Sequence, residues 1–451
     1  MPFTALGLSP VIANPLARLG YTTPTPVQIQ SIPIVLTGQD LLARAQTGTG
    51  KTAAFGLPMI ERLMIKGGAA RGARTPRALI LVPTRELAAQ VHKSLSTYAV
   101  PANLRVIALF GGVSIVPQKK ELARGTDIIV ATPGRLLDHL EQRTVNLSGV
   151  QMLTLDEADR MLDMGFLPPL RRILAVLPKD RQTLLFSATF SPEVIKLSAD
   201  FTRQPQRVDV SANQVMATTV THHVYPINDQ RKGDLLSHVL RETPGQALVF
   251  CRTKHGSNRV GQYLERSGVN AAVIHGNKSQ GARTRALEEF KSGKVRVLVA
   301  TDIAARGLDI AQLPLVVNFD LPLVAEDYVH RAGRTGRAGL DGRAVSLVSP
   351  ADRDLLKGIQ RIISSPIEQV VVEGYAVSAS SEDALPAAGR RHQGRRPQRG
   401  GFRGGESRAP HENRHASRSQ GSHTPGSRPH SHRGRSGRPS QGRGSRSTPR
   451  T

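Results

Sequence analysis

The chain of 451 residues has a single cysteine, Cys251, which excludes an internal disulfide bond and a metal site built from thiolates. Cys251 follows the apolar run at 247–250 and is predicted to be a small core residue. No stretch reaches the roughly 18 uninterrupted apolar residues that a membrane-spanning helix needs. The first residues lack a basic segment followed by an apolar one. We therefore expect a cytoplasmic protein with no membrane partner and no structural metal.

Acidic residues are also scarce, with 35 Asp and Glu against 61 Lys and Arg, so the formal net charge is +26. Such a charge predicts a polyanionic partner, either nucleic acid or an anionic membrane, and the alternative is a positively charged surface that only aids solubility. Hydrophobic residues make up 39% of the chain, enough to bury a sizeable core. The length is about three times that of an average domain and fits two globular domains and a tail.

The shortage of acids is greatest at residues 390–451, which contain 16 Arg, no Lys and only two acids, Glu406 and Glu412. This segment has almost no aliphatic side chains, so it cannot offset the entropy cost of ordering, and we predict a disordered tail over residues 376–451. Residues 399–405 resemble the Arg-Gly-Gly segments of RNA-binding proteins, whose guanidinium groups contact phosphates and stack on bases. A passive solubilising tail is the alternative, and deletion of the tail would distinguish the two by its effect on RNA affinity.

Before the tail, short apolar runs alternate with helical patterns in two successive halves. Continuous apolar strands separated by helices predict parallel sheets covered on both faces, and hence two doubly wound α/β domains in tandem. We place the first domain at residues 1–209, the linker at 210–219 and the second domain at 220–375. The predicted strands are 78–82, 127–131, 152–155 and 183–186 in the first half, and 247–250, 272–274, 295–299 and 315–319 in the second. Ligands of such sheets bind in the loops after the strands.

One of these loops has the composition of a phosphate-binding loop. It follows the run Leu41-Leu42-Ala43 and opens a helix, so that backbone amides and a helix amino terminus would surround the nucleotide phosphates. Lys51 would supply a point charge and Thr52 a hydroxyl for Mg²⁺. Ala45 replaces the first glycine of the general pattern, which makes the loop a variant. The loop consists of Ala45, Gln46, Thr47, Gly48, Thr49, Gly50, Lys51 and Thr52.

An acidic cluster, Asp156-Glu157-Ala158-Asp159, follows the strand at 152–155 and lies 105 residues after Lys51. Alone, such a cluster is usually a solvated loop, but a phosphate loop combined with adjacent carboxylates at a strand end is the minimal apparatus for using a magnesium nucleotide. Asp156 would hold Mg²⁺ through its water shell, and Glu157 would orient and deprotonate the attacking water. Asp159 is better placed to couple this site to another segment. Nucleotide hydrolysis is therefore the first hypothesis.

With these motifs, the chain resembles a DEAD-box ATP-dependent RNA helicase of superfamily 2, from Phe3 to about Val348. Residues 160–166 after the acidic cluster and the basic tail are most similar to the bacterial RhlE subgroup. The resemblance implies two RecA-like domains, with ATP and Mg²⁺ as cofactors and RNA as the partner. It is specific because many independent motifs occur in the expected order.

The resemblance also identifies an adenine-reading segment at residues 3–30. The amide of Gln28 offers a donor and an acceptor that match adenine and mismatch guanine, and the ring of Tyr21 can stack on the base. Phe3 is the isolated aromatic residue upstream of this segment. ATP is therefore expected over GTP, although a core position for Tyr21 in a proline-rich turn is the alternative.

The family contacts the RNA backbone through loops at strand ends, where small residues and helix amino termini expose amides to phosphates. Nothing in the matching segments is suited to read base edges, so binding should be largely independent of sequence. Any one of these loops alone would be an ordinary turn. The implied RNA contacts are Pro83, Thr84, Arg85, Gly111, Gly112, Thr132, Pro133, Gly134 and Arg135 in the first domain, and Gln280, Arg283 and Thr301 in the second.

Further matches concern communication between the two domains. Ser187 and Thr189 would link Asp159 to the second domain, and a capped helix start is an equally good interpretation of these two hydroxyls. The resemblance implies that Gly307 and Asp309 lie at the nucleotide, with Asp309 at the ribose, and that His330 bridges to the acidic cluster. Arg334 and Arg337 match the pair that reaches the γ-phosphate, a contribution of about 10³ or more in rate.

The implied activity is RNA-stimulated ATP hydrolysis with local unwinding of short RNA duplexes or remodelling of ribonucleoprotein. Two other classes remain open: an RNA-binding clamp or annealing scaffold with little unwinding, and a DNA helicase of the same superfamily. The joint presence of Lys51, Thr52, Glu157 and the two arginines argues against the clamp. The segment around Gln28 favours the RNA family over the DNA enzyme. Ribosome-assembly or RNA-decay machinery is a possible partner that no motif identifies.

Overall fold

The protein is described by a computed structural model, in which residues 2–46, 48–65, 75–210, 220–305, 308, 310, 313–336, 341–363 and 367–375 are placed. The predicted tail at 376–451 and nearly all of the predicted linker at 210–219 lie outside the described residues, so both stay predictions. The same holds for the proposed domain boundaries. Among the described helices, none combines the length and the apolar character that crossing a membrane requires.

The first half of the chain forms a seven-stranded sheet in the order β3-β4-β2-β5-β6-β1-β7, and every pairing in it is parallel. Its central strands are continuously apolar because both faces of the sheet are covered. The strands are β1 (Leu41–Arg44), β2 (Ala78–Leu81), β3 (Val106–Leu109), β4 (Ile128–Ala131), β5 (Met152–Leu155), β6 (Gln182–Ser187) and β7 (Gln206–Asp209).

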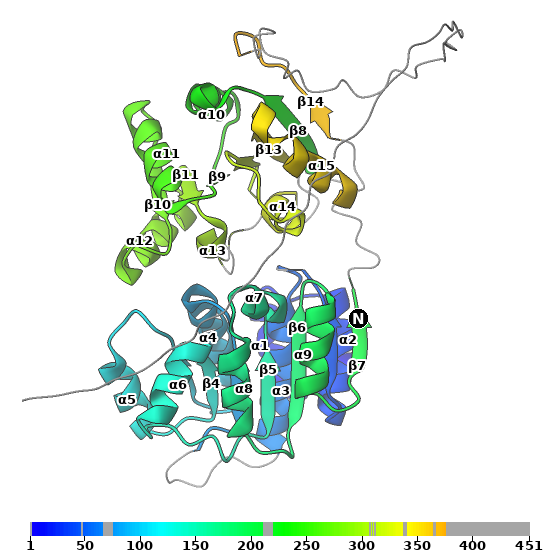
Figure 1. Cartoon of the computed structure of the whole chain (residues 1–451). Coiled ribbons are helices and arrows are strands. Elements are labelled where there is room, and N and C mark those ends of the chain that lie inside the picture. Colours follow the sequence, from blue (N-terminus) through cyan, green and yellow to red (C-terminus); the bar gives the residue numbers. More distant parts are fainter. Residues whose placement is uncertain are drawn as a thin grey trace, which may run out of the picture. The chain divides into compact units, whose positions relative to one another are not determined.

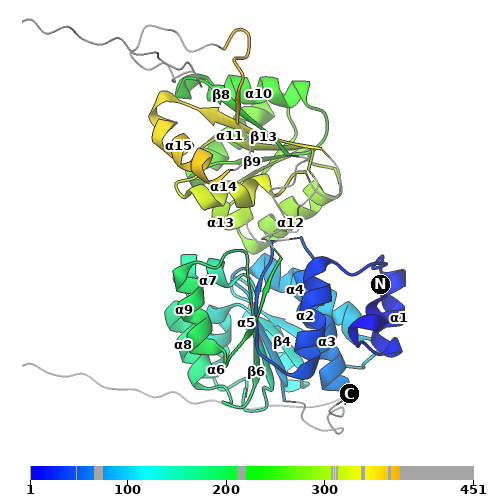
Figure 2. The same ribbon diagram turned by 90° about the vertical axis from the view of Figure 1, so that its right-hand side faces the viewer.

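Helices cover both faces of this sheet (Figures 1 and 2). Side chains of β2 alternate between two cores: Ala78 and Ile80 pack on one face, and Leu79 and Leu81 pack on the other. One core includes η1 (Phe3–Leu6), α1 (Pro10–Arg18), α2 (Pro26–Thr37), α3 (Lys51–Ile65) and α4 (Arg85–Ala99). The other includes α6 (Pro133–Glu141), α7 (Ala158–Asp163), α8 (Leu167–Ala175) and α9 (Pro192–Phe201), with α5 (Ile115–Ala123) packed against it through Leu122.

The second half repeats the arrangement in a second parallel sheet, ordered β10-β11-β9-β12-β13-β8-β14. Numbered from its own first strand, this order is the same as in the first sheet. The strands are β8 (Val220–Pro226), β9 (Ala247–Phe250), β10 (Ala271–Ile274), β11 (Val297–Ala300), β12 (Leu315–Asn318), β13 (Gly342–Val348) and β14 (Glu368–Gln369). Both halves are therefore doubly wound α/β units.

Three apolar clusters fill the second unit. One contains residues of α10 (Lys232–Glu242) and α11 (Lys254–Arg266), and a second contains residues of α12 (Gln280–Lys291) and α13 (Asp302–Ala305). The third contains residues of α14 (Ala325–Ala332) and α15 (Arg353–Ile362). Two short 3-10 helices, η3 (Asp229–Arg231) and η4 (Pro350–Asp352), precede α10 and α15.

The predicted fold class, two doubly wound parallel-sheet domains in tandem, is confirmed. All eight predicted strands are present, with ends shifted by a residue or two. Strand β1 was recognised only as the apolar run before the phosphate loop, and strands β3, β7, β8, β13 and β14 were not among the predictions. The burial of β3 alternates and β7 is half exposed, so neither shows the continuous apolar pattern. Strand β8 contains two histidines and β13 begins with Gly-Arg, which also hides the signal.

Candidate nucleotide and RNA site

The predicted phosphate loop joins the carboxyl end of β1 to the amino terminus of α3, which begins at Lys51. Gly48 and Gly50 have φ values of 84° and 91°, a region that favours glycine. A side chain at Gly50 would also collide with Gln28, because a Cβ there would lie 2.4 Å from the Gln28 Nε2. Lys51 is 6% exposed, and its Nζ donates to the Ala45 carbonyl at 2.9 Å. The loop is thus folded around its own lysine; Thr47 lies outside the described residues.

The amide of Gln28 is buried and supports this loop directly. Its Nε2 donates to the Gly50 carbonyl at 3.1 Å, and its Oε1 accepts from the Thr25 backbone N–H at 2.9 Å as part of a capping box at the start of α2. One amide proton and one lone pair are left for a base. Gln28 therefore has a structural role at the phosphate loop that the sequence interpretation did not include, and its adenine-reading role stays a prediction.

The two aromatic residues of the adenine-reading segment pack in the first core. Phe3 is 5% exposed. The Tyr21 hydroxyl lies 2.6 Å from that of Tyr98, and the two rings meet edge to face. This is the core position that the sequence left open for Tyr21, and stacking of Tyr21 on adenine and a role of Phe3 at the nucleotide stay predictions.

The acidic cluster lies at the end of β5, where Asp156 is 2% and Glu157 is 7% exposed. Glu157 has φ 54° and ψ 55°, a left-handed conformation that is costly for a non-glycine residue and is concentrated at functional sites. Its N–H donates to Asp156 Oδ1 at 3.0 Å. The backbone strain at Glu157 is thus stored beside a buried carboxylate.

Burial raises the pKa of Asp156 to about 6, Lys51 lowers it in part, and the nearby carboxylates Glu157 and Asp159 raise it again. The ionised carboxylate is therefore incompletely balanced by the protein alone, an environment that fits a bound cation. Among the described residues, no group of three His, Cys, Asp or Glu side chains could hold a metal ion. Asp156 and Thr52 would therefore need phosphate oxygens and water to complete the shell of Mg²⁺.

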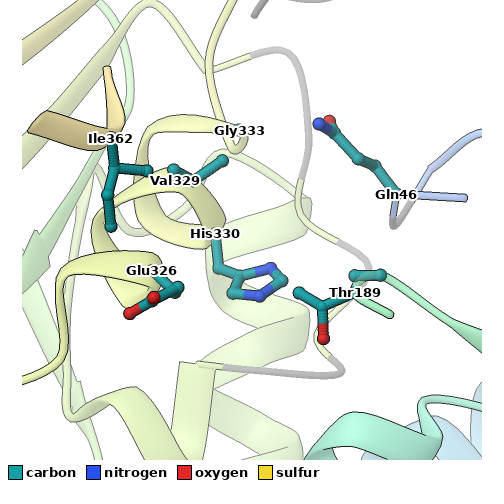
Figure 3. A pocket seen from close by; sticks show the side chains of 8 residues that line it. Gln46, Thr189, Glu326, Val329, His330, Gly333 and Ile362 are labelled. Carbon is teal, nitrogen blue, oxygen red and sulfur yellow. The ribbon is translucent and has the colours of Figure 1, made fainter. Parts of the chain in front are cut away.

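Asp159 joins the acidic cluster to the end of β6. Its Oδ2 accepts from the Ala188 N–H at 3.0 Å and from the Thr189 hydroxyl at 3.5 Å, while the Ser187 hydroxyl lies 3.4 Å from the Asp159 N. Thr189 also lines a pocket of about 180 Å³ together with Gln46, Ala188, Glu326, Val329, His330, Gly333 and Ile362. Figure 3 shows the His330 ring between Glu326 and Thr189, with Gln46 set apart. The predicted coupling residues Asp159, Thr189 and His330 are thus connected through the segment after β6, which bonds to Asp159 and lines the pocket with His330.

The predicted RNA contacts of the first domain follow three neighbouring strands, since β3, β4 and β2 are adjacent in the sheet. Thr84 caps α4 by accepting from the Leu87 N–H at 3.3 Å. Thr132 and Pro133 begin α6, and Pro83 precedes the cap at Thr84. A Cβ at Gly134 would meet nothing within 4 Å, so its backbone is accessible.

The guanidinium of Arg85 packs directly on Gly112, next to Gly111. Gly112 has φ 74°, and a Cβ there would lie 1.6 Å from Arg85 Nη1. Arg135 Nη2 donates to the Val113 carbonyl at 3.0 Å. Burial lowers the pKa of Arg85, and so do the positive charges of Arg283 and Arg135. The site therefore concentrates cationic side chains that an anionic ligand would stabilise.

The predicted RNA contacts of the second domain lie at the starts of helices. Ser279 caps α12, whose first turn carries Gln280 and Arg283. Both side chains contact Glu86, with Gln280 Nε2 at 2.9 Å and Arg283 Nη2 at 3.0 Å from its Oε1. Thr301 follows β11, and its carbonyl accepts from the N–H groups of residues 304 and 305. Sequence reasoning did not single out Glu86, although it lies next to Arg85.

Comparison with known proteins identifies the family. Residues 25–197 match the DEAD/DEAH box helicase model, and residues 231–339 match the helicase conserved C-terminal domain. The chain is 42% identical over 359 residues to the ATP-dependent RNA helicase CshA of Listeria monocytogenes, an alignment that covers 79% of this chain and 68% of that protein. The chain belongs to the DEAD-box family of ATP-dependent RNA helicases.

Other relatives and solved structures agree with this helicase assignment. The DEAD-box ATP-dependent RNA helicase CshA of Geobacillus kaustophilus is 40% identical over 369 residues, covering 82% of this chain and 78% of that protein. The ATP-dependent RNA helicase DeaD of Buchnera aphidicola is 39% identical over 371 residues, and the chain covers 61% of its length. The structure of S. cerevisiae Dbp5 bound to RNA and ADP BeF3 is similar with a TM-score of 0.72 at 29% identity, covering 82% of this chain and 95% of that one.

In this helicase, the predicted arginine finger Arg334 is 4% exposed, and its Nη1 donates to the carbonyls of Leu308 at 2.6 Å and Ile310 at 3.4 Å. Gly307, Asp309 and Arg337 lie outside the described residues. The contacts of Arg334 and Arg337 with the γ-phosphate therefore stay predictions.

Arg331, between His330 and Arg334 in the sequence, is a further central residue that was not among the predicted site residues. It is 1% exposed and forms a two-pronged ion pair with Asp302 at 2.6 Å. Its Nη1 also donates to Asn318 Oδ1 at 2.9 Å, and the guanidinium lies over the Phe250 ring. The helicase thus ties the helix that carries His330 to the helix that starts one residue after Thr301. The only sequence signal was its place within an arginine-rich motif.

Proposed function

We propose that this DEAD-box helicase hydrolyses ATP only when RNA is bound, and that the cycle unwinds short RNA duplexes locally or remodels ribonucleoprotein. The observation that carries the proposal is the network around Asp159. This carboxylate lies three residues after Asp156, and it binds the backbone and hydroxyl of the segment after β6 that also lines the pocket with His330. A change at the nucleotide can therefore reach a second segment through direct hydrogen bonds.

The residues around the phosphate loop have the chemistry that hydrolysis needs. Lys51 would neutralise phosphate charge, while Asp156 and Thr52 would hold Mg²⁺. Mg²⁺ supplies charge neutralisation of the phosphates when bound. Glu157 would orient and deprotonate the attacking water, and its strained backbone supports a role that outweighs the cost in stability. Arg334 and Arg337 would stabilise the charge that develops on the transferred phosphoryl group.

We further propose that the adenine is read by Gln28 with Phe3 and Tyr21 at the base, which favours ATP over GTP. The direct contact of Gln28 with the Gly50 carbonyl supports a link between base recognition and the phosphate loop. RNA would be held by its backbone through the loops after β2, β3 and β4 and through Gln280, Arg283 and Thr301. Exposed amides and guanidinium groups carry no information on base identity, so binding should be largely independent of sequence.

The test is ATP hydrolysis by the full chain without nucleic acid, with single-stranded RNA and with DNA of matched sequence. The control is Glu157→Gln, which keeps the shape of the side chain and removes the base. Strong stimulation by RNA alone, absent in the control, is the expected result. Equal stimulation by DNA would favour the DNA enzyme of the superfamily, and binding of RNA without stimulation would favour the clamp.

Within the family, we propose membership of the RhlE subgroup, on the basis of residues 160–166 and the composition of the tail. Relatives at 39–42% identity carry the names CshA, DeaD and DbpA, so the subgroup has to be tested by function. A cytoplasmic location, an RNA-binding role of the tail, and work with ribosome-assembly or RNA-decay machinery belong to the same proposal. Crosslinking of the chain to RNA in cells, with and without residues 376–451, would test these points together.

A further inference from the structure

A buried polar pair that sequence reasoning did not identify joins two of the proposed RNA-binding loops. Gln118 in α5 is 8% exposed, and His139 in α6 is fully buried. Burying amide and imidazole groups costs free energy unless their hydrogen bonds are satisfied. The contacts of these two side chains therefore indicate why polar residues occupy these positions.

The hydrogen bonds of the pair form a directed chain. Gln118 Nε2 donates to the Phe110 carbonyl at 3.0 Å, which fixes the orientation of the amide because a carbonyl only accepts. Gln118 Oε1 then faces His139 Nε2 at 3.3 Å, so this ring nitrogen carries the proton. Thr144 Oγ1 lies 2.7 Å from His139 Nδ1 and 3.1 Å from the His139 carbonyl. Burial, followed by the charge of Arg135, lowers the pKa of His139 and favours the neutral ring.

The hydrogen bonds of Gln118 and His139 begin at Phe110, one residue after the β3 ladder ends at Leu109. The last ladder pairing of β3 joins Leu109 to Ala131, and the Thr132 N–H donates to the Leu109 carbonyl at 2.9 Å. Beyond this point, Phe110 is held by Gln118 and Val113 is held by Arg135. Side chains connected to α6 therefore hold the loop on both sides of Gly111 and Gly112.

The loop at Gly111 and Gly112 has no free space beside it. Arg85 packs so closely on Gly112 that even a Cβ would lie 1.6 Å from its Nη1. A displaced loop would either collide with Arg85 or release it. One spacing, that between the loop at Gly111 and Gly112 and the start of α6, therefore sets the positions of the loop amides, the α6 amino terminus and the Arg85 charge.

We infer that Gln118 and His139 are positioning residues for RNA binding, which hold the loop at Gly111 and Gly112 in register with the amino terminus of α6. This inference rests on the proposed function, in which both segments contact the RNA backbone. Neither side chain touches RNA in it. They act by fixing the relative position of groups that do, and so reduce the ordering cost of binding.

The test compares variants that break different bonds of the chain. Gln118→Met removes both contacts of the amide at similar volume, and Gln118→Glu keeps the acceptor toward His139 but loses the donor to Phe110. His139→Gln retains a donor toward Gln118 and serves as the conservative variant. Thr144→Val is the matched control, because it removes the hydroxyl beside Nδ1 and leaves Gln118 in place.

For each full-length variant, the RNA concentration that gives half-maximal ATPase stimulation is measured together with kcat at saturating RNA, the KM for ATP and Tm. Gln118→Met and Gln118→Glu should raise the half-maximal RNA concentration about tenfold, the equivalent of one or two lost hydrogen bonds. Their kcat and KM for ATP should stay within about twofold of the unmodified chain, because independent sites affect each other by no more than that. His139→Gln should have a smaller effect. Thr144→Val should lower Tm without changing the half-maximal RNA concentration.

Three outcomes would overturn the inference in different ways. If the half-maximal RNA concentration follows the loss of Tm across all four variants, the pair only stabilises the domain. Arg135→Ala separates this result from failure of the proposed function. If Arg135→Ala leaves RNA stimulation unchanged, the RNA contact at α6 is wrong and the inference falls with it. If Arg135→Ala weakens RNA stimulation but the Gln118 variants do not, only the inference fails.

Discussion

The two halves of this helicase share one strand order, yet they treat the same structural position in opposite ways. In each half, the first strand of the unit is the sixth in the sheet, and the first α-helix after it begins with a buried lysine. Lys51 begins α3 after β1, and Lys232 begins α10 after β8. Lys51 is 6% exposed and Lys232 is 3% exposed.

The difference lies in what each lysine contacts. Lys51 Nζ donates to a neutral carbonyl, that of Ala45. Lys232 Nζ lies 2.8 Å from Asp229 and 3.1 Å from Asp352, so carboxylates neutralise its charge. The loop before Lys51 contains two glycines in left-handed conformations, whereas residues 227–231 contain no glycine. Lys51 also lowers the pKa of Asp156, but its Nζ bonds to a carbonyl, so its charge can still be offset by a phosphate, whereas Lys232 is already paired with two carboxylates.

The largest expected effect is on the first lysine. Lys51→Met should reduce RNA-stimulated ATP hydrolysis by about 10²–10³-fold, because the charge that stabilises the transferred phosphate is lost. The circular dichroism spectrum should not change, since the Ala45 carbonyl loses only one hydrogen bond. Steady-state ATPase rates at saturating RNA give the measurement. Activity within tenfold of the natural chain would show that the charge of Lys51 has no catalytic purpose.

The second lysine should affect stability instead. Lys232→Met leaves Asp352 buried with Arg252 as its remaining cationic partner, and we expect a loss of about 3 kcal/mol in the free energy of unfolding. The ATPase rate per folded molecule should stay within about twofold of the natural chain, because no proposed catalytic group contacts Lys232. Urea unfolding and ATPase assays below the transition would measure the two effects. If Lys232→Met lowered the ATPase rate without lowering the free energy of unfolding, Lys232 would have the catalytic role that is proposed for Lys51.

The incompletely balanced charge of Asp156, in the acidic cluster next to Lys51, should make the stability of the chain depend on pH. Burial raises the pKa of Asp156 in the folded chain to about 6 from its ordinary value of 3.8, so the stability it contributes is present below about 4 and is lost as the pH rises through 6. Asp156→Asn should therefore stabilise the ligand-free chain by up to about 3 kcal/mol at pH 8 while abolishing hydrolysis. Tm measured from pH 4 to pH 8 should show a gap that narrows below pH 6 and nearly closes at pH 4. A gap independent of pH would contradict this explanation.

The smallest expected effect concerns the carboxylate that pairs with Lys232. Burial would raise the pKa of Asp352, but Lys232 and the Ser349 hydrogen bonds outweigh it and hold the pKa below 3.8. A lowered folded pKa contributes stability above the unfolded pKa, and this stability is lost as the pH falls below about 4. Ser349→Ala removes the hydroxyl that donates to Asp352 at 2.8 Å and should cost about 1 kcal/mol.

Unfolding midpoints at pH 7 and pH 3 give the measurement for Ser349→Ala. The difference between the variant and the natural chain should shrink at pH 3, where Asp352 begins to take up a proton. An equal loss at both pH values would show that the hydroxyl acts through packing rather than through the carboxylate.

The local motifs of this chain could be predicted from sequence because their geometry is set within a few residues. A strand end, a glycine turn and a helix start fix the loop around Lys51, and a single strand end places Asp156 and Glu157 side by side. The fold class was also predictable, since both faces of each sheet are covered and the central strands are continuously apolar. Edge and polar strands such as β7 and β8 lacked this pattern and were missed.

The two parallel sheets and the order of the motifs follow from the amino-acid sequence, because strand periodicity and turn composition are local properties. The pairing of polar side chains depends on how the folded chain packs. Asp352 lies 120 residues from Lys232, and Gln118 lies 21 residues from His139, distances along the chain at which no pattern predicts contact. Such pairs form because a buried polar group must find a partner wherever packing brings one within reach. For that reason, two lysines at equivalent helix starts differ in their direct contacts: Lys51 Nζ bonds to a carbonyl, and Lys232 Nζ bonds to two carboxylates.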